Sequence, residues 1–173
     1  MIKQYKGPLG KFQYDDTEFI EKSGNLHYIG AETDGSKIKI PKGITNCTFM
    51  FEGCNIVTPP TIPKGVTLCF GMFRNCKSLI KAPEIPEKTT NCCTMFYGCD
   101  SLTTGTPLPR RIPKRILNCF YMYQGCSALK NYCLDDAIYR KDIYRSCSPV
   151  VQEIDGFIQN FKERSQLNGQ KVL

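Results

Sequence analysis

Histidine is almost absent from this chain, which has one, His27, in 173 residues. A nucleophilic cysteine needs a nearby base, and structural zinc takes cysteine and histidine ligands about two to four residues apart. The paired cysteines of this sequence have six residues between them, as in Cys47 and Cys54. A glycine-rich phosphate loop is also missing, and acidic pairs such as Asp15-Asp16 are adjacent, so their side chains need not converge. We therefore predict a protein that is not an enzyme and that holds no metal and no cofactor.

Long apolar runs are missing as well. No stretch approaches the roughly 18 apolar residues that identify a membrane-spanning helix. The N-terminal "MIKQYKGPLGKFQYDD" has basic residues, but neither an apolar run nor a small-residue cleavage site follows them, so it is not a secretory signal. These features predict a cytoplasmic protein. The alternative is a location at the cell surface, if a leader was removed.

Acidic residues are outnumbered by basic ones, 16 against 23, which gives a formal charge of +7. Such a surplus favours acidic partners. The chain has the length of one domain. Its 41% of hydrophobic and 11% of aromatic residues are typical of a folded protein and exclude a solvated disordered tail.

One unit is written four times along the chain. Each copy has Ile-Pro, a cysteine seven positions after the isoleucine, Met-Phe or Met-Tyr, and a second cysteine. The starts of the copies are 22, 23 and 27 residues apart. The copies are "IPKGITNCTFMFEGC" (residues 40–54), "IPKGVTLCFGMFRNC" (62–76), "IPEKTTNCCTMFYGC" (85–99) and "IPKRILNCFYMYQGC" (112–126).

This period, with one supersecondary unit per copy, predicts a solenoid. One copy alone is unstable, because burying each large side chain contributes about 1.5–3 kcal/mol, whereas ordering each of its residues costs about 1–2 kcal/mol. The prolines predict short extended strands. Cys47, Met50, Phe51 and Cys54 have the spacing of one face of a helical turn. The predicted fold is therefore an α+β repeat, a short leucine-rich-repeat-like solenoid.

The order Ile-Pro, a short turn with Met-Phe, Gly-Cys and then a leucine such as Leu102 is similar to the BspA-type leucine-rich repeat of bacterial surface proteins. The Met-Phe version resembles the related mycoplasma-lipoprotein-type repeat. The resemblance covers residues 38–130. It implies strands on one side of a curved stack, helical turns on the other, and non-catalytic binding of macromolecules. Members of that family are commonly large and exported, whereas this chain is short.

The single structural domain is predicted to have three parts. Residues 1–39 form an N-terminal β cap, with a hairpin around the turn "TDGSK". Residues 40–130 form the four-repeat solenoid. Residues 131–173 form a C-terminal helical cap and tail, because Ser148-Pro149 is typical of a helix start and apolar residues follow at helical spacing.

Eleven cysteines allow two interpretations. Equivalent positions of neighbouring repeats are expected about 4.7–4.9 Å apart, within the range of a disulfide, but parallel side-chain directions rarely give its torsion. Reduced cysteine packs as a small hydrophobic residue. We favour reduced columns in the core, with cross-links as the alternative. The columns are Cys47, Cys69, Cys92 and Cys119, and Cys54, Cys76, Cys99 and Cys126.

Two sets of exposed residues are candidates for partner binding. The basic cluster "PRRIPKR" lies at the longer spacing before the fourth unit, and insertions in repeat proteins often mark the binding face. A solvated charged turn is the alternative. The second set lies just before the Ile-Pro pairs. The candidates are Arg110, Arg111, Lys114 and Arg115 in the first set, and Lys39, Thr61 and Glu84 in the second.

The predicted function is a non-catalytic protein-binding module that presents a rigid repeat surface. Because the aromatics belong to the core pattern, nucleic acid is not expected, and the predicted partner is a protein with an acidic surface. Two settings are open. One is a small intracellular inhibitor, encoded by a phage or mobile element, that blocks a host protein. The other, implied by the resemblance, is an adhesin-like fragment at the cell surface.

Reversing the charge of the basic cluster tests its role. We expect Arg110→Glu combined with Arg111→Glu to weaken partner binding without unfolding the protein, because exposed charges at the edge of an interface mainly change the rate of association. Binding is measured by pull-down and folding by thermal melting. Unchanged affinity would assign both arginines to a solvated turn.

Overall fold

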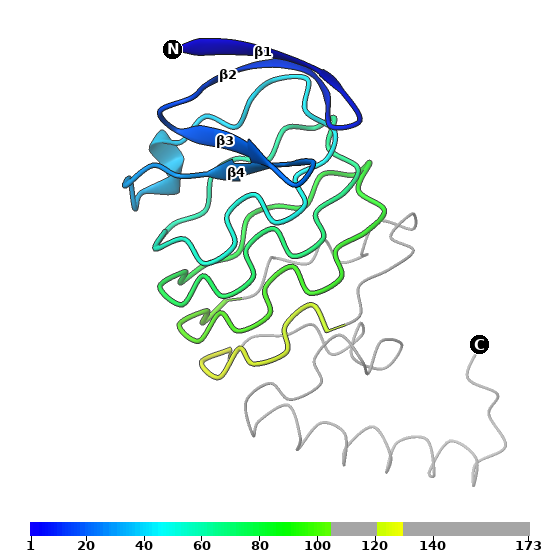
Figure 1. The fold of residues 1–173 in the computed structure, drawn as a ribbon. Coiled ribbons are helices and arrows are strands. Elements are labelled where there is room, and N and C mark those ends of the chain that lie inside the picture. Colours follow the sequence, from blue (N-terminus) through cyan, green and yellow to red (C-terminus); the bar gives the residue numbers. More distant parts are fainter. Residues whose placement is uncertain (105–120, 130–173) are drawn as a thin grey trace, which may run out of the picture.

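The computed structural model describes residues 1–104 and 121–129 of the chain. The N-terminal part forms two antiparallel hairpins of two strands each, and the rest of the described chain winds beneath them (Figure 1). The regular elements are β1 (Ile2–Gly7), β2 (Gly10–Asp15), β3 (Phe19–Lys22), β4 (Asn25–Tyr28) and the 3-10 helix η1 (Gly35–Lys37).

The turns of the two hairpins do not use the stretch "TDGSK", which contains η1 instead. The β1–β2 register pairs Gly7 with Gly10, and the β3–β4 register pairs Lys22 with Asn25. Each loop therefore has two residues. In the second loop, Ser23-Gly24, both residues have positive φ (53° and 73°), which matches the twist of the flanking strands.

The repeat units wind as successive coils, which lie side by side below the hairpins (Figure 1). We call them coil 1 (residues 40–61), coil 2 (62–84), coil 3 (85–104) and coil 4 (121–129), as far as they are described. The hairpins cover the free side of coil 1. Tyr28 N of β4 donates to Met50 O at 2.7 Å, and Thr45 N of coil 1 donates to Leu9 O at 2.8 Å.

Backbone N–H groups alternate between two kinds of partner along residues 47–54 of coil 1. Those of the odd-numbered residues donate to carbonyl groups of coil 2, beginning with Cys47 N to Leu68 O at 2.8 Å. Those of the even-numbered residues from position 50 donate to the carbonyl three residues earlier in their own coil. Thr48 N donates to Asn46 Oδ1 at 2.9 Å. Every N–H group of this segment therefore has a partner, and neighbouring coils are joined in register.

The predicted helical turn between the two cysteines of each coil is wrong. In every coil, two residues of this segment have a left-handed backbone conformation. One precedes the methionine, with φ between 53° and 56°, and the other precedes the second cysteine, with φ between 58° and 79°. An α-helix needs negative φ at every residue, so the chain makes consecutive tight turns instead. The residues are Phe49, Gly71, Thr94 and Tyr121 at the first position, and Gly53, Asn75, Gly98 and Gly125 at the second.

The prediction of an α+β leucine-rich-repeat-like solenoid is therefore wrong. The described residues contain no α-helix, and their only sheets are the two N-terminal pairs. The short strands expected at the Ile-Pro segments are missing from this part of the chain as well. Isolated parallel bridges, such as Asn46 to Leu68 and Leu68 to Asn91, connect the coils instead. The predicted C-terminal helical cap, residues 131–173, lies outside the described residues.

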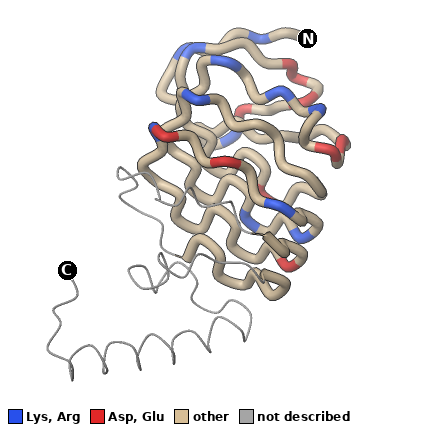
Figure 2. The backbone as a smooth tube through the Cα atoms, turned by 180° about the vertical axis from the view of Figure 1, so that it is seen from behind, with Lys and Arg blue, Asp and Glu red and all other residues tan. Residues whose placement is uncertain are grey.

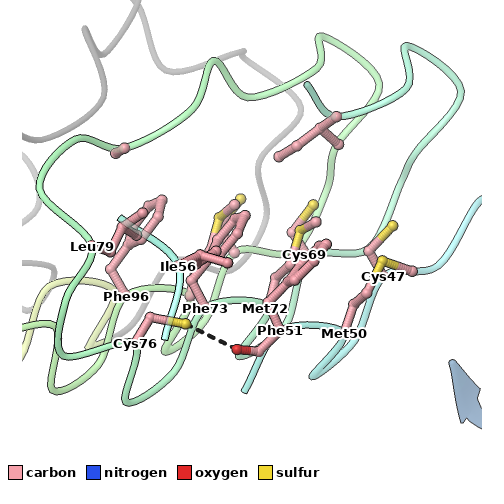
Figure 3. Packing of buried hydrophobic residues seen from close by; sticks show 14 of the residues in the cluster. Cys47, Met50, Phe51, Ile56, Cys69, Met72, Phe73, Cys76, Leu79 and Phe96 are labelled. Atoms are coloured by element: carbon pink, nitrogen blue, oxygen red, sulfur yellow. Dashed lines mark hydrogen bonds between the residues drawn. The ribbon is translucent and has the colours of Figure 1, made fainter. Parts of the chain in front are cut away.

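The core consists of columns of equivalent side chains, which Figure 3 shows from close by. The aromatic column is the most regular. Neighbouring rings lie 5.3–5.7 Å apart between centroids, with interplanar angles of 4–10°. The column contains Phe51, Phe73, Phe96 and Tyr123, all fully buried. Stacking at this spacing is favourable for aromatic rings, so each coil extends the column of the coil before it.

Two glycines fix the β1–β2 hairpin to coil 1. Gly10 has φ of 123° and Gly43 has φ of 91°, both in the left-handed region. A Cβ atom at Gly10 would clash with Gly43 O, and one at Gly43 would clash with Lys11 O. The two backbones therefore approach closely only because neither residue has a side chain.

We expect Gly43→Ala to lower the free energy of unfolding by about 2 kcal/mol or more, because it combines backbone strain with a clash against Lys11 O. Gly65→Ala is the control, since its φ is not positive and no atom lies within 4 Å of an added Cβ. Urea unfolding measures both variants. Equal stabilities would contradict the close contact.

Candidate functional site

The Ile-Pro side of the molecule has a groove of about 830 Å³ between coils 1, 2 and 3. We call it the proline groove. One wall is residues 58–64, where coil 1 passes into coil 2, and the other is residues 81–88, where coil 2 passes into coil 3. The lining residues are Thr58, Pro59, Pro60, Thr61, Ile62, Lys64, Lys81, Pro83, Glu84, Ile85, Pro86, Glu87 and Lys88.

The groove exists because its two walls are not joined by backbone hydrogen bonds. Among the described residues, no such bond connects residues 58–66 with residues 81–88. Proline has no N–H to donate, and Pro59, Pro60 and Pro83 occupy these walls. The space between the windings is therefore open to another molecule.

Both ends of the proline groove are nevertheless closed by hydrogen bonds between windings. At one end Ile80 N donates to Val57 O at 3.0 Å, and at the other Thr90 N donates to Thr67 O at 2.8 Å. Thr90 Oγ1 also donates to Thr67 O, at 3.2 Å. The walls are thus held apart at a fixed separation before any partner arrives.

The groove combines an apolar floor with charges of both signs. Ile62 and Ile85 are buried beneath it, with exposed fractions of 6% and 7%. Three lysines and two glutamates line it, and none of these five forms an ion pair with another described residue. The charged residues are Lys64, Lys81, Glu84, Glu87 and Lys88.

The residues predicted from the sequence fall into three groups. Thr61 and Glu84 are exposed and lie on opposite walls of the proline groove, so the structure brings these two together. Lys39 is exposed but does not line the groove. The basic cluster, Arg110, Arg111, Lys114 and Arg115, lies outside the described residues.

The groove-forming role of the prolines was not predicted from the sequence. The runs "VTPPTIP" and "KAPEIP" were assigned to short strands, because proline favours extended backbone. Two adjacent prolines, Pro59 and Pro60, also remove two consecutive donors from the wall. The missing N–H donors of these two prolines are the feature of the sequence that indicates a gap between neighbouring coils.

Most of the described cysteines are buried packing residues. Cys47, Cys54, Cys69, Cys76 and Cys99 are free thiols, as the reduced-core interpretation predicts. The second cysteine of a coil donates its thiol hydrogen to the backbone carbonyl oxygen of the aromatic residue in the preceding coil. Cys76 Sγ lies 2.9 Å from Phe51 O (Figure 3), Cys99 Sγ 3.1 Å from Phe73 O, and Cys126 Sγ 3.0 Å from Phe96 O.

Burial shifts these thiols away from the reactive thiolate. It raises the pKa of Cys54 to about 11 and those of Cys69 and Cys99 to about 12. The pKa values of Cys47 and Cys76 are also raised, again mainly by burial. The thiolate is the nucleophile and the metal ligand, so none of these five thiols is activated for either role. No group of three or more histidine, cysteine, aspartate or glutamate side chains in the described ranges is placed to hold a metal ion.

Comparisons with known proteins returned no relative. No family model, no curated protein and no solved structure matches this chain. The resemblance to the bacterial surface repeats therefore remains a prediction from the motifs. Within the part of the chain that the structure describes, no helix is long and apolar enough to cross a membrane.

The raised thiol pKa values predict a loss of stability at alkaline pH. Unfolded thiols ionise near pH 8.5, whereas the buried ones keep their protons to about pH 11 or 12. Above about pH 8.5 the unfolded chain therefore binds fewer protons, and the free energy of unfolding falls as pH rises. For one thiol, the loss at pH about 10 is about 2 kcal/mol.

Comparing wild type with Cys69→Ala isolates one thiol from the other groups that titrate at high pH. We expect the variant to be less stable at neutral pH but to lose about 2 kcal/mol less between pH about 7 and about 10. Urea unfolding at both pH values measures this difference. Parallel losses in the two proteins would contradict a buried, protonated Cys69.

Proposed function

We propose that this protein is a non-catalytic protein-binding module and that its partner occupies the proline groove. The observation that carries the proposal is a gap in the hydrogen-bonded stack, whose two walls carry charged residues that form no ion pair with another described residue. Thr61 and Glu84, which the sequence nominated independently, lie on those walls.

Rigidity supports this role. The inter-coil hydrogen bonds on either side of the groove order its walls in advance, so the partner does not have to order them on binding. The groove offers apolar contact along its proline surface and charge contact through its lysines and glutamates. Partly apolar, partly charged surfaces of this kind are typical of protein interfaces.

The buried thiols support a role without catalysis. Burial keeps five cysteines, in or against the core, in the protonated form, and the lone histidine, His27, lies on β4 and does not line the groove. The settings predicted from the sequence, an intracellular inhibitor or an adhesin-like surface fragment, both require such a module and remain predictions. The cytoplasmic location also remains a prediction.

A charge reversal in the groove tests the proposal. We expect Lys88→Glu to weaken partner binding about tenfold, because it removes one of the three lysines of the groove and adds a third glutamate, which repels an acidic partner. Lys22→Glu on β3 makes the same charge change at an exposed position away from the groove. Equal effects of the two substitutions on affinity would contradict the groove as the site.

Photocrosslinking locates the partner directly. A benzophenone amino acid at Thr61 is expected to capture the partner, whereas the same group at Glu21 is expected to give no adduct. Unchanged melting temperatures of both proteins serve as the folding control. Capture only from position 21 would place the interface elsewhere and overturn the proposal.

A further inference from the structure

A pair of lysines faces each other across the β1–β2 hairpin. Lys6 and Lys11 are direct cross-strand partners, and both are exposed. Direct partners in an antiparallel pair lie on the same face of the sheet, and like charges at such positions destabilise it. Among the described residues, neither lysine forms an ion pair.

A third lysine comes from coil 1. The close contact between Gly10 and Gly43 fixes the turn that contains Lys42 against the hairpin. The three lysines line a concavity of about 620 Å³, which we call the lysine concavity. Its other lining residues are Gln4, Tyr5, Phe12 and Gln13, and none is acidic. Figure 2 shows several lysine or arginine positions on this N-terminal end of the molecule.

Two other lysines in the N-terminal part, Lys3 and Lys37, have acidic partners. Lys3 Nζ lies 3.3 Å from Asp16 Oδ2, and Lys37 Nζ lies 3.5 Å from Glu32 Oε2. Acidic side chains are thus available in this region but are directed to other lysines. The uncompensated charge of the lysine concavity has no folding rationale, because it lowers the stability of the hairpin. Local features that conflict with stability are expected at functional sites.

We infer that the lysine concavity binds an acidic segment of a protein, whose carboxylates lie among Lys6, Lys11 and Lys42. The side-chain amides of Gln4 and Gln13, which are also cross-strand partners, add hydrogen-bonding groups at the same concavity. The site is separate from the proline groove and shares no residue with it. Its acidic ligand is therefore an inference beyond the proposed function.

The aromatic residues of the concavity favour a protein ligand over single-stranded nucleic acid. Tyr5 and Phe12 stack on each other, with centroids 4.9 Å apart and an interplanar angle of 19°. Phe12 has an exposed fraction of only 5%. Nucleic-acid sites of this kind offer open ring faces to the bases, and here Phe12 offers none.

The substitution Lys6→Glu separates binding from folding. It replaces a repulsive cross-strand pair with an attractive one, so we expect an unchanged or higher melting temperature. Affinity for a fluorescein-labelled oligoglutamate peptide, measured by anisotropy at low salt, is expected to fall about tenfold. Lys42→Gln is expected to lower the affinity for the same peptide about threefold. The control is Lys22→Glu, an equal charge change at the last residue of β3, which does not line the lysine concavity.

Three outcomes would overturn the inference. The first is an unchanged affinity of Lys6→Glu for oligoglutamate. The second is an equal loss in Lys22→Glu, which would assign the binding to the net charge of the whole protein. The third is tighter binding of a thymidine oligonucleotide than of oligoglutamate, with the loss in Lys6→Glu confined to the oligonucleotide. None of these results bears on Thr61 or Glu84, so the groove proposal is tested separately.

Discussion

The alternation of backbone N–H partners along each turn segment is the constraint on which the structure depends. Four of the eight N–H groups of residues 47–54 donate to groups of their own coil, and the other four donate to carbonyl groups of the next coil. A coil by itself would leave those donors without protein partners. Stacking in register satisfies them, and the same register places equivalent side chains above one another. The aromatic column and the thiol bonds to aromatic carbonyls are therefore consequences of the backbone pattern.

The sequence revealed which residues form columns but not the backbone that carries them. Cysteine, methionine and phenylalanine at intervals of three, four and seven residues fit one face of a helix, and consecutive tight turns satisfy the same spacing. The left-handed position before the methionine is glycine only in coil 2, at Gly71; Phe49, Thr94 and Tyr121 occupy it elsewhere. Non-glycine residues at such positions cost about 1 kcal/mol or more. Propensity alone therefore could not find them, because hydrogen bonding to a neighbouring coil determines the conformation.

The candidate sites were predictable to different degrees. Thr61 and Glu84 could be nominated because they precede the repeated Ile-Pro pairs, which fixed their place on one side of the stack. The groove between them depends on hydrogen bonds that the prolines prevent, and this required the positions of both windings. The lysine concavity was hidden for another reason. Lys6 and Lys11 become opposite only when the hairpin turns at Pro8-Leu9, and Lys42 joins them only through the contact of Gly43 with Gly10.

At the second cysteine position of the repeat, cysteine meets two demands that no other small residue meets together. In coil 1, Phe51 O already accepts the N–H of Cys54, and the thiol of Cys76 reaches the same oxygen from coil 2. Alanine would offer no donor there, and serine would bury a more polar group in an apolar column. A thiol is apolar enough for the core and still donates weakly. The second cysteines of the described coils thus follow from the stacking constraint. The two surfaces proposed for binding lie where prolines interrupt the hydrogen bonds between coils and where like charges face each other on a hairpin.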